Sequence, residues 1–251
     1  IDMLPWHRWD GDAYKGMSVP SQQAGMPEYS ALADVVREAG GILQATPNAL
    51  KKETVARIFR LSMSGLGKKA LKTTIVAAMD VKTDRKVYKL AQIGAKLVSE
   101  YLGGNVRFQT LSEPFTNYCD GVFGPLFEEL PAGVAAISAT EEERRRMFGT
   151  ESYRAQFRKQ WKSNETRVFH KDLGDMWIVS APDTSMVGKS FRQIAKEKGA
   201  DEITLFMDLM RDHDRDVRWK TAVTNDRPGP RRELMASPYT LPGFNDSGAH
   251  N

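Results

Sequence analysis

Residues 240–250 read Thr-Leu-Pro-Gly-Phe-Asn-Asp-Ser-Gly-Ala-His. An apolar run stops abruptly in a carboxylate, a hydroxyl, a glycine and an imidazole. A buried strand has this pattern when it brings polar side chains to the mouth of a parallel α/β fold. Asp246 is therefore the first candidate for a catalytic group. The alternative is structural, because Asn, Asp, Ser and Gly after a strand also form an ordinary turn or a helix N-cap.

Upstream of this stretch the chain alternates between helical and strand patterns. Helices are predicted at 28–39, 51–64 and 84–102, and apolar strands follow them at 42–45, 73–79 and 106–111. Repeated helix-then-strand units favour a parallel sheet or barrel with helices outside. The chemistry of such folds gathers at the carboxyl ends of the strands. Those ends offer Gln44, Thr46, Asn48, Asp80, Thr110, Ser112, Glu113 and Asp246.

The segment at about 114–171 interrupts this alternation. It is rich in aromatic residues, and Thr140 followed by three glutamates predicts the capped start of a charged helix. We expect an inserted subdomain, which forms either a lid or wall over the strand ends or a peripheral helical unit. Beyond it the patterns predict strands at 176–181, 217–224 and 239–244, with helices at 190–198, 201–212 and 231–236.

Composition limits the classes of function. The 251 residues are 41% hydrophobic, enough for a substantial core, and no apolar run approaches the ~18 residues of a membrane span. The 36 basic and 32 acidic residues are interspersed, so the net charge of +4 does not indicate a nucleic-acid partner. The single Cys119 excludes an internal disulfide and fits a reducing, cytoplasmic location. Both ends look cut, and we expect the chain to be part of a longer protein.

Common catalytic and metal-binding motifs are absent from the sequence. It has no phosphate-binding loop, no nucleophile elbow and no His-Glu-x-x-His pair. The four histidines have no ligand spacing, and we expect His170 and His213 to be solvated. His7 lies between two tryptophans in a long loop, which makes it a packed residue or a weak candidate for substrate binding.

The stretch ending in Asn-Asp-Ser-Gly-Ala-His resembles the last-strand motif of the N-acyl-D-amino-acid deacylases of the amidohydrolase superfamily. Segments at 10–12, 19–21, 41–44 and 179–182 resemble that family in the same order. The resemblance implies a partial (β/α)8 TIM-type barrel, the C-terminal half of a metal-dependent hydrolase domain, with the insertion described above.

The resemblance also implies an activity: hydrolysis of the amide bond of a small N-acyl-D-amino acid or a related linear amide. Asp246 matches the family aspartate that contacts zinc and acts as general base, while most zinc ligands are expected outside this chain. Such a carboxylate accepts a proton as water attacks the carbonyl. Ser247, His250 and His7 are weaker candidates for substrate binding.

The sequence departs from the family pattern at two strand ends. The family histidines of the fifth and sixth strands would fall near Thr46 and within Ile75–Asp80, and neither place has a histidine. An alternative hypothesis is therefore a barrel without catalytic activity that acts as a binding or scaffold protein.

Overall fold

The fold was analysed on a computed structural model, which describes residues 1–4, 17–48, 51–65 and 67–243. The chain divides into two compact units, one formed by residues 1–114 together with the segment from Thr224 onward, the other by residues 115–223. Among the described residues, no helix combines the length and the apolar character needed to cross a membrane.

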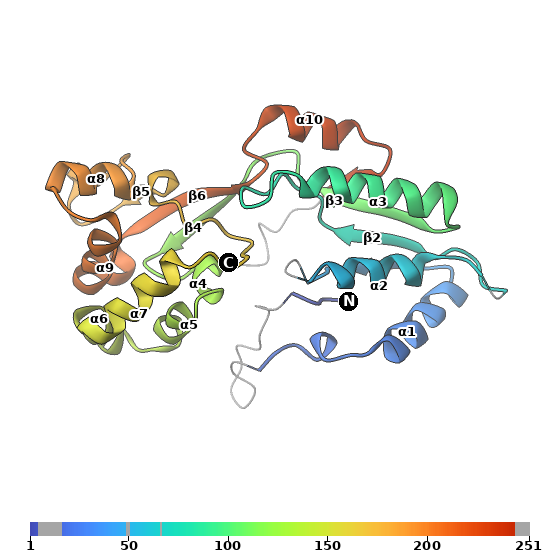
Figure 1. Cartoon of the computed structure of the whole chain (residues 1–251), viewed down its shortest axis with the longest axis horizontal. Helices are drawn as coiled ribbons and strands as arrows, with labels where there is room; N and C mark the ends of the chain where they lie inside the picture. The colour runs from blue at the N-terminus through green and yellow to red at the C-terminus, as the bar shows by residue number, and fades with distance from the viewer. Residues whose placement is uncertain (5–16, 49–50, 66, 244–251) are drawn as a thin grey trace. The chain divides into compact units, whose positions relative to one another are not determined.

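The first unit contains a four-stranded parallel sheet (Figure 1). Its strands, in spatial order, are β1 (Ile42–Ala45), β2 (Lys72–Val76), β3 (Asn105–Thr110) and β7 (Thr240–Pro242). Its helices are α1 (Met26–Glu38), α2 (Lys52–Ser62), α3 (Val87–Tyr101) and α10 (Pro228–Ala236), with a short 3₁₀ helix η2 (Pro20–Gln22). The predicted alternation of helices and parallel strands is confirmed.

All four helices of this unit share one core with a single face of the sheet. In register across the sheet lie Ala45, Ile75, Phe108 and Thr240, and all four are buried. The core they join contains Tyr29 and Ala33 of α1, Ile58 and Leu61 of α2, Ala95 and Val98 of α3, and Leu234 of α10. The alternate strand residues, such as Gln44, Thr74 and Gln109, are exposed or half-buried.

Two of the helices end as the sequence predicts. Gly40 and Gly103 follow the last residues of α1 and α3 with φ of 68° each. A side chain is strained in this left-handed conformation, whereas glycine adopts it freely and so ends a helix.

The second unit contains a three-stranded sheet and most of the remaining helices. The strand order is β4 (Phe115–Asp120), β6 (Arg218–Thr224) and β5 (Trp177–Ser180), and β5 and β6 run antiparallel. The helices are α4 (Pro125–Glu128), α5 (Pro131–Ser138), α6 (Glu141–Gly149), α7 (Glu151–Lys162), α8 (Phe191–Lys198), α9 (Glu202–His213) and the 3₁₀ turns η3 (Leu173–Asp175), η4 (Thr184–Met186) and η5 (Asp214–Asp216).

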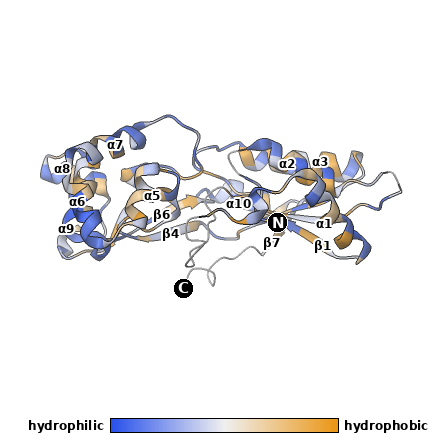
Figure 2. Ribbon diagram, turned by 90° about the horizontal axis from the view of Figure 1, so that it is seen from below, coloured by the Kyte–Doolittle hydropathy of each residue, from blue (hydrophilic) through white to orange (hydrophobic). Residues whose placement is uncertain are grey.

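Aromatic rings form the centre of this second core. Phe127 stacks on Phe206 at 5.6 Å between ring centroids and meets Trp219 edge-on at 6.0 Å. The indole of Trp219 donates a hydrogen bond of 2.8 Å to the Gly121 carbonyl, so its one polar atom is satisfied within the core. Figure 2 shows the mixture of apolar and polar residues on the helices of both units.

The predicted insertion and the second unit begin at nearly the same residue but end differently. The insertion was expected at about 114–171, whereas the compact unit runs to Val223. The reason is the pairing of β5 with β6, which places the strand patterns at 176–181 and 217–224 in a separate sheet. A hydrophobic strand pattern does not reveal which partner the strand will have.

Candidate functional site at the carboxyl edge of the parallel sheet

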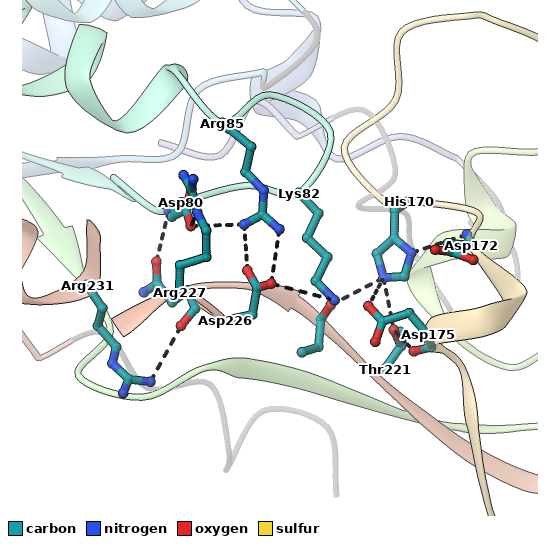
Figure 3. Close-up of polar contacts among 12 residues, drawn as sticks. Asp80, Lys82, Arg85, His170, Asp172, Asp175, Thr221, Asp226, Arg227 and Arg231 are labelled. Carbon is teal, nitrogen blue, oxygen red and sulfur yellow. Dashed lines mark hydrogen bonds and ion pairs between the residues drawn. The ribbon is translucent and has the colours of Figure 1, made fainter. Parts of the chain in front are cut away.

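The candidate site lies where β2 ends and where the chain enters α10. Asp80 follows β2, and Asn225, Asp226 and Arg227 lead into α10. Because β1, β2, β3 and β7 are parallel, their carboxyl ends share one edge of the sheet. Asp80 is one of the strand-end residues predicted from the sequence, and charged side chains surround it in the structure (Figure 3).

Asn225 joins the backbones at this edge. Its side-chain oxygen accepts a hydrogen bond of 2.8 Å from the Asp80 backbone amide. The backbone amide of Asn225 donates one of 3.0 Å to the Asp80 carbonyl. Its side-chain nitrogen donates to the Leu111 carbonyl at 3.2 Å. Asn225 is fully buried with φ of 59°, a conformation that asparagine tolerates better than most residues. The segments after β2 and β3 are thereby fixed to the start of α10.

The Asp80 carboxylate is fully buried and bound by two arginines. Arg227 donates two hydrogen bonds to it, of 2.8 and 2.7 Å, and Arg85 donates a third of 2.9 Å. This fork-to-fork pairing with Arg227 is the strongest form of a charged hydrogen bond in proteins. The bound guanidinium groups compensate the cost of burying the charge.

Arg85 also binds a second carboxylate, that of Asp226, at 2.5 and 3.0 Å. Burial alone would raise the pKa of Asp226, but the hydrogen bond and charge of Arg85 outweigh it and hold the pKa below its usual value. The same hydrogen bond raises the pKa of Arg85. Both groups therefore stay charged, and Arg85 bridges the two aspartates.

The basic side chains around these aspartates continue beyond Arg85 and Arg227. The ammonium of Lys82 lies 4.0 Å from an oxygen of Asp226. Arg231 of α10 lies 3.8 Å from the Glu113 carboxylate, which follows β3. The cluster is thus an ion network in which positive and negative groups alternate, and its positive groups outnumber its carboxylates by one if Glu113 is included.

This network does not fit the zinc that the family resemblance implies. Both oxygens of Asp80 accept hydrogen bonds from guanidinium groups, which repel a metal cation. In the ranges that the structure describes, no group of three or more His, Cys, Asp or Glu residues could hold a metal ion. We therefore derive no chemical step through a metal at these strand ends.

The main predicted site residues, Asp246, Ser247, His250 and His7, lie outside the described residues. Of the other strand-end residues, Asp80 and Glu113 belong to the ion network. Thr110 is fully buried, and its hydroxyl has no hydrogen-bond partner among the described residues.

Sequence reasoning missed Arg85, Asn225, Asp226 and Arg227. One signal was present: Asn225-Asp226 follows a predicted strand, at 217–224, just as Asn245-Asp246 follows the one predicted at 239–244. Their attachment to Asp80 could not be inferred, because it joins segments far apart in the sequence.

His170, in the second unit, is not solvated as expected. Its side chain is 10% exposed, and its Nε2 lies 2.9 Å from the Thr221 hydroxyl and 3.2 Å from the Ala222 carbonyl. The Asp172 amide donates to Nδ1 at 3.2 Å. These partners tie the loop that holds His170 to β6, and the mostly polar sequence around His170 gave no sign of them.

The comparisons give relatives of unassigned function. No family model matches the chain. It is 35% identical over 247 residues to uncharacterized proteins of Mycobacterium bovis and Mycobacterium tuberculosis. The match covers 96% of this chain but 40% of each relative, so the chain spans less than half the length of the curated proteins it matches.

Two solved structures are similar at a lower level. One is an N-acyl-D-glutamate deacylase of Bordetella bronchiseptica with zinc and a phosphonate inhibitor, with 14% identity and a TM-score of 0.43, covering 89% of this chain and 36% of that one. The other is a D-aminoacylase, with 12% identity and a TM-score of 0.43, covering 92% of this chain and 37% of that one. At these values neither similarity establishes a fold or an activity for this chain.

Proposed function

We propose that this chain forms part of an amidohydrolase-type barrel that hydrolyses the amide bond of small N-acyl-D-amino acids. The observation that carries the proposal is the Asn-Asp-Ser-Gly-Ala-His motif, which begins at Asn245, shortly after β7, a strand that ends at Pro242 and pairs in parallel with β3. In barrels and open parallel sheets, residues after the carboxyl ends of strands carry the chemistry.

The one-sided core of the first unit supports a barrel. Parallel sheets are normally covered on both faces, yet α1, α2, α3 and α10 all pack against the same face here. A strip of a (β/α)8 barrel has this construction, because its other face lines the barrel interior. The polar Gln44, Thr74 and Gln109 would then face that interior. A partial barrel, with residues 115–223 inserted before its last strand, is the architecture we propose.

Asp246 is the proposed general base. As water attacks the amide carbonyl, the carboxylate accepts the proton, and the resulting carboxylic acid then protonates the departing amine. Ser247, His250 and His7 are proposed to bind the substrate. Zinc remains part of the proposal only through the family resemblance, with its ligands outside the described residues. The location we propose is the cytoplasm.

The experiment that tests this activity is an assay of amine release from paired N-acetyl-D- and N-acetyl-L-amino acids. The proposal predicts release from the D-series, with acidic, apolar and polar side chains tested separately. Equal release from both enantiomers would contradict the proposed substrate class. Absence of release from either series, with added zinc and without it, would contradict the activity itself.

A second candidate function is a binding protein without catalysis. The observation that favours it is Asp80, which follows the strand where the family has a metal-binding histidine but is held by Arg227 and Arg85. Titration calorimetry with N-acetyl-D-amino acids separates the two functions. Binding without amine release would support the binding protein, and turnover would exclude it.

A further inference from the structure

The three-stranded sheet of the second unit carries a row of side chains, one from each strand, which we call the sheet row (Figure 1). Its members are Tyr118 of β4, Lys220 of β6 and Trp177 of β5. Trp177 lies directly opposite Lys220 in the register of β5 and β6, and the Lys220 ammonium lies 5.9 Å from the centre of the Tyr118 ring. The lysine therefore stands between two aromatic rings.

The sheet row faces solvent. Tyr118 is 58% exposed, Trp177 is 37% exposed, and Lys220 is exposed as well. The Tyr118 hydroxyl, the Lys220 ammonium and the Trp177 indole N–H have no hydrogen-bond acceptor among the described residues. On each strand a residue next to the row is buried on the core side, namely Cys119, Trp219 and Ile178. This alternation is that of a sheet with one covered face and one open face.

The charge of the open face is positive at the sheet row. The charged residues of the three strands are Asp120, Arg218 and Lys220. Arg218 donates two hydrogen bonds to Asp120, of 2.7 and 3.3 Å, so these two charges neutralise each other. Arg215 and Asp216 of η5, which precedes β6, also have opposite signs. Lys220 thus keeps a charge that no carboxylate in the described part of the chain pairs with.

The charges beside β5 have partners of their own. Lys189, whose carbonyl accepts a hydrogen bond from β5, pairs with Glu197 at 2.7 Å. The Asp175 carboxylate lies 3.8 Å from Nε2 of His170, which in turn contacts the Thr221 hydroxyl. Thr221 is buried and follows the lysine of the sheet row, so its side chain points to the covered face. Asp175 therefore does not neutralise the open face.

We propose that the sheet row binds single-stranded nucleic acid, with one base stacked on Tyr118, another on Trp177 and the phosphate between them on Lys220. Every base has a face that stacks on an exposed aromatic ring, and a lysine binds phosphate as a point charge. Neighbouring strands lie about 4.8 Å apart, so the two rings stand about 10 Å from each other across β6. Two unstacked bases and their shared phosphate match this order of ring, cation and ring.

The position of Lys220 favours this ligand over others. An apolar protein surface placed on both rings would bury the lysine without a partner, which is costly. A neutral sugar chain would stack on the rings and leave the charge unused. A duplex holds its bases inside and would reach the row only through its phosphates. The net charge of +4 does not indicate a nucleic-acid partner, whereas the sheet row combines a local charge with two stacking surfaces.

The first test measures the binding of fluorescein-labelled oligouridylate by fluorescence anisotropy at low salt. We expect saturable binding, and Tyr118→Ala or Trp177→Ala should each raise the dissociation constant roughly 5- to 150-fold, as expected for the loss of one stacked base. Trp177→Phe keeps a ring and should retain most of the affinity. The matched control is Tyr101→Ala on α3, which is 69% exposed and off the sheet; its constant should not change.

Two results of this first test would overturn the proposal. One is a parent protein that does not bind the oligouridylate. The other is a set of alanine and phenylalanine variants with equal dissociation constants, because binding would then not involve the rings. Circular dichroism of each variant should match that of the parent protein, since both aromatic residues are exposed.

The second test measures the phosphate contact through the salt dependence of binding. Lys220→Gln should weaken binding and lower the slope of log K against log salt by about 0.7, the value for one phosphate of a single strand. Lys196→Gln, on an exposed lysine of α8, is the control and should leave the slope unchanged. An RNA duplex of the same length and polygalacturonate should both bind more weakly. Equal affinity for the duplex, or tighter binding of the acidic polysaccharide, would contradict the proposed ligand.

Discussion

Asp80 and Arg144 are two places where a charged side chain lies inside the protein, one in each unit. Asp80 has no exposed surface, and Arg227 and Arg85 bind its oxygens. Arg144 is 4% exposed, and its guanidinium binds both oxygens of the buried Asp214 at 2.9 and 2.8 Å. Removing one partner of a buried pair leaves an uncompensated charge, which costs more than the pair itself contributes.

The first prediction concerns Asp80. Asp80→Asn should lower the free energy of unfolding by roughly 1 to 3 kcal/mol, because Arg227 loses its counter-charge, Arg85 keeps only Asp226, and one hydrogen-bond acceptor becomes a donor. Urea unfolding followed by circular dichroism measures the change. Glu38→Gln, an exposed acid on α1, is the control and should stay within about 0.5 kcal/mol of the parent protein. Equal effects of the two substitutions would show that the ion network does not stabilise the fold.

The second prediction concerns Arg144, on α6. Arg144→Met keeps the length of the side chain but removes its charge and leaves Asp214 buried and unpaired, so we expect a loss of roughly 3 to 5 kcal/mol. The neighbouring Arg145 is 39% exposed and pairs with Glu141 on the surface. Arg145→Met should cost less than about 1 kcal/mol. Denaturant unfolding followed by tryptophan fluorescence distinguishes the two, and a neutral Arg144→Met would contradict the role of the pair.

At the scale of residues, the sequence predicted a polar group at the end of β2 but not what binds it. Asp80 was recognised because it follows an apolar strand. Its partners Asn225 and Arg227 come from the other end of the chain, and local patterns hold no information on such pairs. The prediction that His170 is solvated was wrong for the same reason, because its partner Thr221 is distant in sequence.

At the scale of elements, sequence signals predicted correctly those features that depend on neighbouring residues, such as helix caps. The predicted cap of α6 is confirmed in full: the Glu143 amide donates to the Thr140 hydroxyl at 3.3 Å, and the Glu143 carboxylate accepts from the Thr140 amide at 2.8 Å. The hydrogen bonds that the Glu143 carboxylate accepts from the amide and the hydroxyl of Thr140 hold its pKa below the usual value. Strand pairing was less predictable: the sequence predicted the strands β5 and β6 but not that they pair with each other in a separate sheet.

The third prediction is that Thr140→Ala lowers the free energy of unfolding by about 1 kcal/mol, because the Glu143 amide at the start of α6 loses the hydroxyl that accepts its hydrogen bond. Thermal and urea unfolding measure the loss. Ser152→Ala is the control, because Ser152 lies exposed inside α7 and has no capping role. If both variants unfold like the parent protein, the capping box does not contribute to stability.

The fourth prediction concerns Glu129, which anchors the segment at 167–171. Its two oxygens accept hydrogen bonds from the amides of Val168 and Phe169, at 2.9 and 3.1 Å. Burial nevertheless raises the pKa of Glu129 above its ordinary value of 4.5. The folded protein thus holds this proton more tightly than the unfolded chain, so stability should fall as the pH rises from 4.5 through the raised pKa.

The measurement is the free energy of unfolding of the parent protein and of Glu129→Gln at a series of pH values upward from 4.5. The difference between them should change with pH only in that interval. Parallel curves across the interval would show that the burial of Glu129 does not influence its ionisation.

At the scale of the whole molecule, the sequence predicted the class of fold but not the extent of the second unit. The alternation of helices and strands predicted an α/β fold with a parallel sheet, which is confirmed. The extent of the second unit depends on strand partners, which the pattern does not contain. The proposed barrel rests on the face of the first sheet that no helix among the described residues covers.

The fifth prediction concerns Asp246 and decides between catalysis and binding alone. The value of kcat/KM for an N-acetyl-D-amino acid is measured for the parent protein, for Asp246→Asn and for the exposed control Asp216→Asn. If Asp246 is the general base, the first substitution should lower kcat/KM roughly 10²- to 10⁴-fold, while the control should leave it unchanged. Turnover by Asp246→Asn at the rate of the parent protein would contradict a catalytic role for this carboxylate.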